Sequence, residues 1–140
     1  MFGSIVAAGM KMLANADFGS RNTFITRVIK DMILSQLGES NRTKNIILAC
    51  EEIFVNIVSY SGTDQIGFSC KQSKSTLLIT FIDNGTEFDP VKSEREETDF
   101  EQMDQGGMGI IFARNNSEDM IYNRIDGSNV LTMVFDTDGI

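Results

Sequence analysis

The spacing of apolar side chains divides the chain into a helical first part and a stranded second part. Apolar residues recur at intervals of three and four through Asn22–Leu37, and Gly38 follows them. The same period returns after Ser40 or Asn41, either of which can cap a helix, and continues to about Tyr60. This pattern predicts two amphipathic helices, the first of them ended by a glycine.

Beyond residue 62 the period changes from 3.6 to 2, which is typical of strands. Four strands are predicted there, at Gln65–Lys71, Thr76–Asp83, Met120–Ile125 and Val130–Phe135. A short apolar helix is expected at about Ile110–Ala113, and the polar stretch Pro90–Gln105 has no period. An earlier strand is predicted at Met10–Ala16.

The order of these elements is β-α-α-β-β-loop-α-β-β, and nothing in the sequence resembles an internal repeat or an inter-domain linker. Paired strands interleaved with helices favour an α+β fold, a two-layer α/β sandwich in which helices cover one face of a mixed, mostly antiparallel sheet. We therefore expect a single domain over residues 1–140.

Charge and composition narrow the range of functions. The chain has 20 acidic and 12 basic residues and a net charge of −8, which argues against direct binding to nucleic acid or to an anionic membrane. It contains no histidine, so histidine-based triads and most zinc sites are excluded. Two cysteines and no membrane-spanning apolar run lead us to expect a cytoplasmic protein.

Glu52 and Asn56 form the first candidate motif, on the second predicted helix. They are four residues apart, so both side chains project from one face of the helix about one turn apart. A carboxylate and an amide oxygen at this spacing can orient a hydroxyl group and complete a Mg²⁺ shell. The simpler reading, taken alone, is a solvated glutamate beside an asparagine.

Two further motifs follow at the ends of predicted elements. Asp83 ends the strongest predicted strand and Gly85 lies two residues later, which fits a turn that brings backbone close to a ligand or a plain Asp-Asn-Gly turn. Gly106-Gly107-Met108-Gly109 precedes the short helix, where backbone amides and the helix dipole can bind phosphate. The alternative there is a flexible loop.

Taken together, the three motifs resemble the ATP-binding boxes of the GHKL, or Bergerat-fold, superfamily. Glu-x-x-x-Asn, Asp-x-Gly-x-x-Phe-Asp and Gly-x-Gly occur here in the order of that superfamily. Within it the chain is similar to the single-domain anti-sigma-factor serine kinases, on the run Gly106–Tyr122 and the closing hairpin Asp126–Leu131. The resemblance extends over about residues 20–135.

The resemblance implies ATP and Mg²⁺ as cofactors and gives each motif a role. Glu52 would be the general base, Asn56 would bind the Mg²⁺ that bridges the phosphates, and Asp83 would accept from the adenine amino group. Gly85 would let backbone approach the base, Gly107 and Gly109 would offer amides to phosphate, and residues 90–105 would form a lid. The nucleotide-contacting residues implied in this way are Asn56, Asp83, Gly85, Phe88, Gly106, Gly107, Met108, Gly109 and Ile110.

The chain departs from the family pattern at several places. Tyr60 stands where histidine is common, and Val130 stands where a threonine is usual, so that a contact near the adenine would be missing. Residues 83–104 contain nine acids and two bases, so the lid is acidic. Phosphate binding would then depend on Mg²⁺ and backbone amides, and the lid would suit a basic partner.

The implied function is an ATP-dependent protein serine/threonine kinase of the anti-sigma type. Such a protein phosphorylates a small STAS-type antagonist and binds a sigma factor, and dimers are usual in the family. The alternative is a regulatory module that binds ATP or ADP and a protein partner without transferring phosphate.

Overall fold

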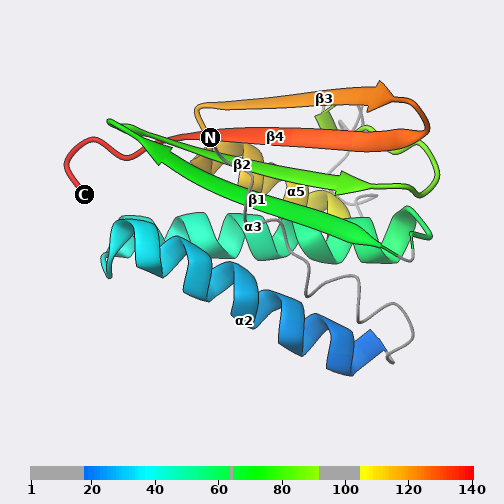
Figure 1. Ribbon diagram of the computed structural model, residues 1–140, viewed down its shortest axis with the longest axis horizontal. Coiled ribbons are helices and arrows are strands. Elements are labelled where there is room, and N and C mark those ends of the chain that lie inside the picture. Colours follow the sequence, from blue (N-terminus) through cyan, green and yellow to red (C-terminus); the bar gives the residue numbers. More distant parts are fainter. Residues whose placement is uncertain (1–17, 64, 92–104) are drawn as a thin grey trace.

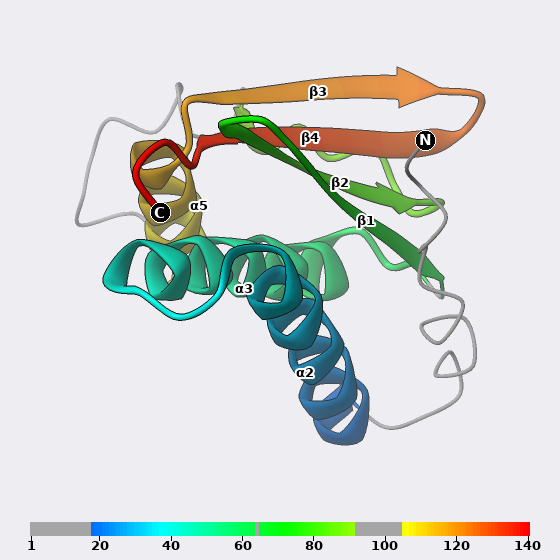
Figure 2. The ribbon, with the colours of Figure 1, turned by 60° about the vertical axis from the view of Figure 1, so that its left-hand side comes forward.

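An antiparallel four-stranded sheet forms one layer of the structure, and helices cover one of its faces (Figure 1, Figure 2). The computed structural model describes residues 18–63, 65–91 and 105–140. Figure 2 shows the sheet above, α3 and α5 beneath it, and α2 packed further out against α3. This arrangement confirms the predicted α+β fold with its helices on one face of the sheet.

The first two helices match the predicted period closely. Helix α2 spans Phe18–Leu37 and begins four residues earlier than predicted, whereas α3 spans Asn41–Tyr60 as expected. Gly38 has a φ of 74° and donates its N–H to the Leu34 carbonyl over 2.8 Å, which closes α2. The Ser40 hydroxyl accepts from the third amide of α3 and is therefore the cap of that helix.

The strands follow the predicted alternation to within two residues at each end. They are β1 (Ile66–Ser73), β2 (Thr76–Asp83), β3 (Asp119–Ile125) and β4 (Ser128–Asp136). Their order in the sheet is β1-β2-β4-β3, and each neighbouring pair is antiparallel. The sheet is therefore wholly antiparallel among the described strands, not mixed, and the strand predicted at Met10–Ala16 lies outside the described residues.

Short turns fix the register of the two hairpins. Lys74 and Ser75 join β1 to β2, and Lys74 has a left-handed φ of 55°. Asp126 and Gly127 join β3 to β4 with φ values of 49° and 82°, both in the region that a type I′ hairpin turn requires. The Asp-Gly sequence therefore sets which residues of β4 face the helices.

Side chains that alternate along the strands form the core against α3. The largest of its fully buried side chains include four phenylalanines, Phe54, Phe68, Phe81 and Phe135. Helix α5 spans Gln105–Asn116, longer than predicted, and contributes Ile110 and Ala113 to the same core. Most of the lid predicted at residues 90–105 lies outside the described residues. None of the described helices is long and apolar enough to span a membrane.

Candidate functional site

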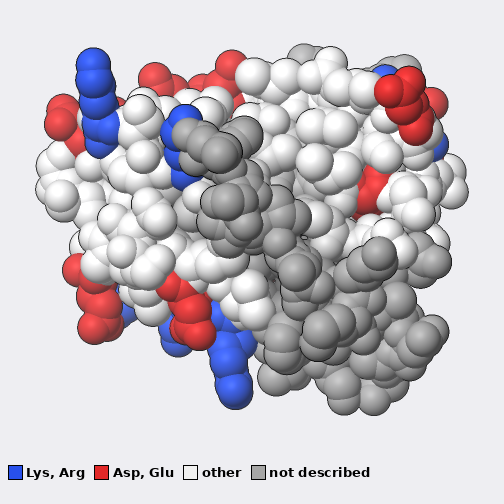
Figure 3. All heavy atoms as spheres, viewed as in Figure 1, with Lys and Arg blue, Asp and Glu red and all other residues white. Residues whose placement is uncertain are grey.

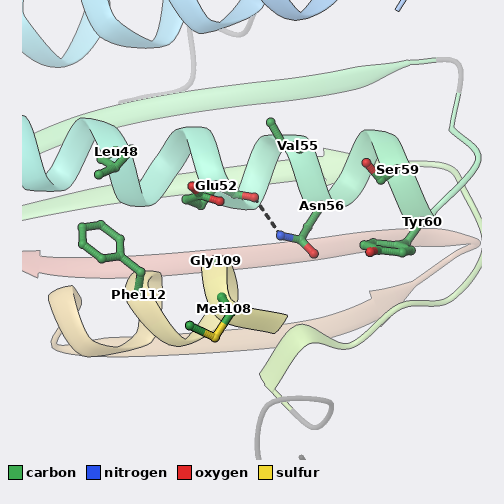
Figure 4. A pocket seen from close by; sticks show the side chains of 9 residues that line it. All are labelled: Leu48, Glu52, Val55, Asn56, Ser59, Tyr60, Met108, Gly109 and Phe112. Carbon is green, nitrogen blue, oxygen red and sulfur yellow. Dashed lines mark hydrogen bonds between the residues drawn. The ribbon is translucent and has the colours of Figure 1, made fainter. Parts of the chain in front are cut away.

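One face of α3 carries residues at every fourth position that point toward α5 (Figure 4). Leu48, Glu52, Asn56 and Tyr60 lie along this face, because a spacing of four keeps side chains nearly in line on a helix. The buried stripe of the core runs beside this face, and Asn56 belongs to both. The Glu52 face therefore lies at the edge of the core, next to the first turns of α5.

A cavity of about 660 Å³ lies between this face and the first turns of α5, within the size range of small-molecule sites. Its described lining residues are Leu48, Glu52, Val55, Asn56, Ser59, Tyr60, Met108, Gly109 and Phe112. They include one carboxylate and no lysine or arginine. An anion bound here would therefore meet no side-chain cation on the described walls of the cavity.

Asn56 places a buried side-chain oxygen without a described hydrogen-bond partner at the cavity. Its side chain is 2 % exposed, and its Nδ2 donates to the Glu52 carbonyl over 2.9 Å. Its Oδ1 is buried and accepts no hydrogen bond in the structure. Because a buried acceptor without a partner destabilises the folded state by about 1–3 kcal/mol, this oxygen is suited to a ligand that reaches it.

Glu52 lies against the α5 backbone at Gly109. A Cβ built at Gly109 would collide with Oε2 of Glu52 and come within 3.3 Å of its Cβ. The glycine therefore makes room for the carboxylate at the start of α5. This contact brings the general base predicted by the sequence and the Gly-x-Gly motif to one place.

The glycines of that motif lie inside α5, not in a loop before it. The helix begins at Gln105, so Gly106 and Gly107 belong to its first turn. The first four amides of a helix have no partner within it, and they carry the positive end of its dipole. Gly109 is the fifth residue of α5, so its amide already lies among those that the helix itself can bond. Because Gly109 has no side chain, the Glu52 carboxylate can lie against the α5 backbone at that position. The amides without a partner inside the helix are those of its first turn.

A second polar cluster lies at the carboxyl end of β2. Asp83 is 4 % exposed, and its Oδ1 accepts from the Gly85 amide over 2.9 Å and from Nδ2 of Asn129 over 3.0 Å. Among the described residues, Oδ2 of Asp83 accepts no hydrogen bond. That oxygen is the one left to receive an amino group of a ligand.

Asn129, on β4, is the centre of this cluster. Its Nδ2 also donates to the Thr86 carbonyl over 2.9 Å. Its Oδ1 accepts from the Tyr122 hydroxyl over 2.5 Å, from Arg124 over 3.1 Å and from the Phe88 amide over 3.3 Å. All the hydrogen-bonding capacity of the Asn129 amide is therefore used within the protein.

The position of Asn129 changes one expectation from the sequence. Val130 was expected to stand in place of a threonine beside the adenine, but it points to the opposite face of the sheet. Asn129 is buried on the Asp83 side because the alternation along β4 places it there. The residue of β4 next to Asp83 is thus polar, and the contact expected to be missing at Val130 stays a prediction.

Gly85 is required for packing within the protein. A Cβ there would overlap the Ser61 carbonyl oxygen and lie 2.6 Å from its Oγ. The next amide, of Thr86, donates to the same carbonyl over 2.6 Å. This close approach joins the turn after β2 to the end of α3. The role predicted for Gly85 toward an adenine base stays a prediction.

An aromatic pair connects the two clusters. Phe88 is half-buried and stacks on Tyr60 with ring centroids 5.8 Å apart. Tyr60 lines the cavity and Phe88 donates its amide to Asn129, so the pair spans the distance between the Asn56 and Asp83 clusters. Ile110, in contrast, is 4 % exposed and belongs to the core, so its side chain is not part of the cavity.

The match with known families agrees with this geometry. The family model of the histidine kinase-like ATPase domain matches residues 20–135. The chain belongs to this family. A search of the curated proteins finds no match to it. As a histidine kinase-like ATPase domain, the chain is an ATP-binding module of the GHKL superfamily, and domains of this kind usually bind ATP together with Mg²⁺.

The described residues of this ATPase domain fit a magnesium ion that is held mainly by phosphate and water. No group of three or more cysteine, aspartate or glutamate side chains in the described part of the chain is arranged to hold a metal. Asn56 offers one buried oxygen with no other partner. Mg²⁺ prefers few protein oxygens and keeps several waters and phosphate oxygens, so one such ligand suits it.

Glu51 and the two cysteines are not among the described residues that line the cavity. Burial is the main cause that raises the pKa of the half-buried Glu51, opposed by the positive charge of Lys30 and assisted by the negative charge of Glu52. Burial also raises the pKa of Cys50 well above its ordinary value and that of Cys70 to about 11. Both thiols are buried, which agrees with an inert structural role.

Several lining residues went unpredicted. Leu48 and Tyr60 are four residues from Glu52 and from Asn56, so the spacing of the first motif was a signal that could have found them. Asn129 was detectable only from the register of the last hairpin. Phe112 lies within the predicted short helix, but only the tertiary packing of α5 on α3 places it at the cavity.

Proposed function

We propose that this ATPase domain is an ATP- and Mg²⁺-dependent protein serine/threonine kinase of the anti-sigma type. The observation that carries the proposal is the contact of Glu52 with Gly109, one turn from the unpartnered oxygen of Asn56. The proposed base, the proposed metal ligand and the first turns of α5 then lie at one cavity, and phosphoryl transfer mainly needs such positioning and charge stabilisation.

In the proposed reaction Glu52 accepts the proton of a serine or threonine hydroxyl. The hydroxyl oxygen bonds to the γ-phosphorus, the bond from that phosphorus to the β–γ bridging oxygen breaks, and ADP leaves. Asp83 would hold the adenine amino group through Oδ2, and the first amides of α5 would face the phosphates. Mg²⁺, held by Oδ1 of Asn56, would neutralise phosphate charge.

The proposed protein substrate is a small STAS-type antagonist, and the proposed second partner is a sigma factor. Both follow from the resemblance of the motif set to the anti-sigma kinases, and both suit a protein in the cytoplasm. The acidic run at residues 83–104 supports a basic docking surface on one of these partners.

The test is transfer of labelled γ-phosphate to a cognate STAS-type antagonist by the wild type, Glu52→Ala and Glu51→Ala. We expect the Glu52→Ala rate to fall at least about 100-fold, as is usual for the loss of a general base. Glu51→Ala is the matched control, because that carboxylate is adjacent in sequence but does not line the cavity. Equal transfer by wild type and Glu52→Ala would show that the base is assigned wrongly.

A second candidate is a module that binds nucleotide and a protein partner without phosphate transfer. The absence of lysine and arginine from the described lining of the cavity favours it, because no side-chain cation there would stabilise the transferring phosphoryl group. Tight binding of Mg-ATP by a wild type that labels no partner would establish this second function and refute the first.

A further inference from the structure

The described cavity has a polar end and an apolar end, and Glu52 lies between them (Figure 4). Asn56 lies one turn after Glu52 on α3 and Leu48 lies one turn before it, so neighbours in this series are about 6 Å apart along the helix. Leu48 is 42 % exposed, and the half-buried ring of Phe112 lines the same end from α5. We call Leu48 and Phe112 the apolar end of the cavity.

The polar end of the cavity adjoins the Asp83 cluster. Tyr60 lines the cavity beyond Asn56 and stacks on Phe88, which donates its amide into that cluster. In the function proposed above, adenine lies at Asp83 and Mg²⁺ at Asn56. The nucleotide then extends from the polar end toward Glu52, and the γ-phosphate is its part nearest to the base. The apolar end lies beyond the γ-phosphate, so nucleotide binding does not account for it.

The geometry of phosphoryl transfer fixes the direction from which the accepting hydroxyl approaches. The attacking and leaving oxygens lie roughly in line across the phosphorus, so the hydroxyl comes from the side opposite ADP. On α3 that side is the one that carries Leu48. The polypeptide that brings the hydroxyl to Glu52 must therefore pass over the apolar end of the cavity.

A positive charge lies further along the same line of α3. Lys44 is exposed and precedes Leu48 by one turn, so it follows the apolar end at the same spacing of about 6 Å. Acidic and basic side chains both lie around the end of the molecule at which α2 joins α3 (Figure 3). The attraction of Lys44 for an acidic side chain is therefore local and modest.

We propose that the apolar end is a subsite for the protein substrate, and that it binds an apolar side chain two positions from the accepting serine or threonine. An extended chain advances about 3.3 Å per residue, so two residues cover the distance of about 6 Å from Glu52 to Leu48. Side chains two positions apart lie on the same side of an extended chain, so both can face the cavity. Four positions from the acceptor, an acidic side chain meets Lys44. This inference rests on the kinase function proposed above.

The first test is labelling of a serine/threonine peptide library by the full-length chain, with Mg²⁺ and ATP labelled in the γ-phosphate. Each position within four residues of the acceptor is varied in turn, on both sides of it. We expect leucine two positions from the acceptor to exceed glycine by at least about 10-fold in kcat/KM, the lower end of what an apolar pocket discriminates. An acidic residue four positions away should exceed lysine by about threefold.

Variants of the chain assign these preferences to residues. Leu48→Ser should raise KM for the preferred leucine peptide at least about 5-fold with kcat little changed, because it removes binding that ground state and transition state share. Its ADP affinity should stay within about twofold of wild type. Ile140→Ser is the matched control, because Ile140 is also 42 % exposed but lies outside the described cavity. Lys44→Glu should reverse the preference four positions away, from acidic to basic residues.

Equal labelling of all residues two positions from the acceptor, on both sides of it, would overturn the inference. A leucine preference that Leu48→Ser leaves unchanged would also overturn it, and the lack of an acidic preference four positions away would refute the role of Lys44. Labelling of a STAS-type antagonist without labelling of any peptide would overturn the subsite, while the proposed kinase function would stand. Labelling of neither would refute both.

Discussion

Two buried asparagines in this protein behave in opposite ways. Asn56 and Asn129 are 2 % and 4 % exposed, and each lies beside a carboxylate of the predicted nucleotide site. Asn129 has its full hydrogen-bonding capacity satisfied within the chain, whereas Oδ1 of Asn56 has no partner among the described residues. Burial alone therefore does not distinguish a structural amide from a ligand-binding one; the unused acceptor does.

The largest expected effect is a difference in the free energy of unfolding between variants of these two residues, measured without nucleotide. Asn129→Leu removes hydrogen bonds to five groups and leaves Asp83 buried with one fewer donor, so it should lower the free energy of unfolding by about 3 kcal/mol. Asn56→Leu removes one hydrogen bond, from Nδ2 to the Glu52 carbonyl, together with an acceptor that is already unpaired; the two effects offset, so it should change that free energy by less than about 1 kcal/mol.

Urea denaturation of both variants without nucleotide measures this difference directly. Two equal losses of stability would mean that the amide of Asn56 is as well satisfied as that of Asn129. The comparison of the two asparagines would then fail.

Gly109→Ala sharpens the comparison at Glu52 and Asn56, the pair to which the proposed function gives the base and the metal ligand. The added methyl group would displace the Glu52 carboxylate, which is the end of a flexible side chain, so the fold should survive. Alanine also favours a helix by about 1 kcal/mol over glycine. We expect a transfer rate lowered by about 10- to 100-fold, with ADP affinity changed much less.

Single-turnover transfer and calorimetry on the same variant separate these two effects. Combining Gly109→Ala with Glu52→Gln provides the control, because the second change should add little once the carboxylate is misplaced. A full additive loss in the double variant would show that Gly109 does not act through Glu52.

Tyr122→Phe tests the hydrogen bonds around Asn129 with a smaller change than Asn129→Leu. It removes one of three donors to Oδ1 of Asn129 and should cost about 1 kcal/mol of stability at neutral pH. Burial, and next the negative charge of Glu87, raise the pKa of Tyr122 above 10.0. A group with a raised pKa stabilises the fold below its unfolded pKa and loses that contribution as pH rises through its folded pKa.

Wild type should therefore lose stability above about pH 10 faster than Tyr122→Phe does, and the two curves should converge there. Chemical denaturation of both proteins at a series of alkaline pH values measures these two stability curves. Parallel curves would indicate that the tyrosine pKa is not raised in the folded protein.

The smallest expected effect is at Glu51, which is next to Glu52 in sequence but does not line the described cavity. Its pKa is raised by burial, so its contribution to stability is present below about pH 4.5 and is lost as pH rises through the folded value. Glu51→Gln should thus be more stable than wild type at pH 7, by less than about 1 kcal/mol. The gain should disappear near pH 4, and a gain that persists there would contradict the shift.

Periodicity predicted most of the fold because each element carries its own signal. Helix α3 and strand β2 have the predicted bounds, as the cap at Ser40 and the alternation through Thr76–Asp83 are local in sequence. The extent of α5 was underestimated, since glycine disfavours helices by itself and the contact of Gly109 with Glu52 depends on tertiary structure.

The site was predictable where its members share one helix, and harder to predict where they do not. Glu52 and Asn56 belong to one helical face, so their spacing brings them together. Asn129 reaches Asp83 only through the pairing of β2 with β4, which places residues 46 positions apart side by side. The requirement for glycine at position 85 likewise comes from Ser61, which precedes it by 24 residues.

The most direct test of the central claim is calorimetry of ADP binding with and without Mg²⁺, on wild type and Asn56→Leu. If Oδ1 of Asn56 is reserved for the metal bound to the nucleotide, wild type should bind Mg-ADP at least about 10-fold more tightly than ADP in EDTA, equivalent to about 1.4 kcal/mol. Asn56→Leu should lose this difference. Equal affinity of wild type with and without Mg²⁺, or unchanged Mg-ADP binding by the variant, would contradict the account.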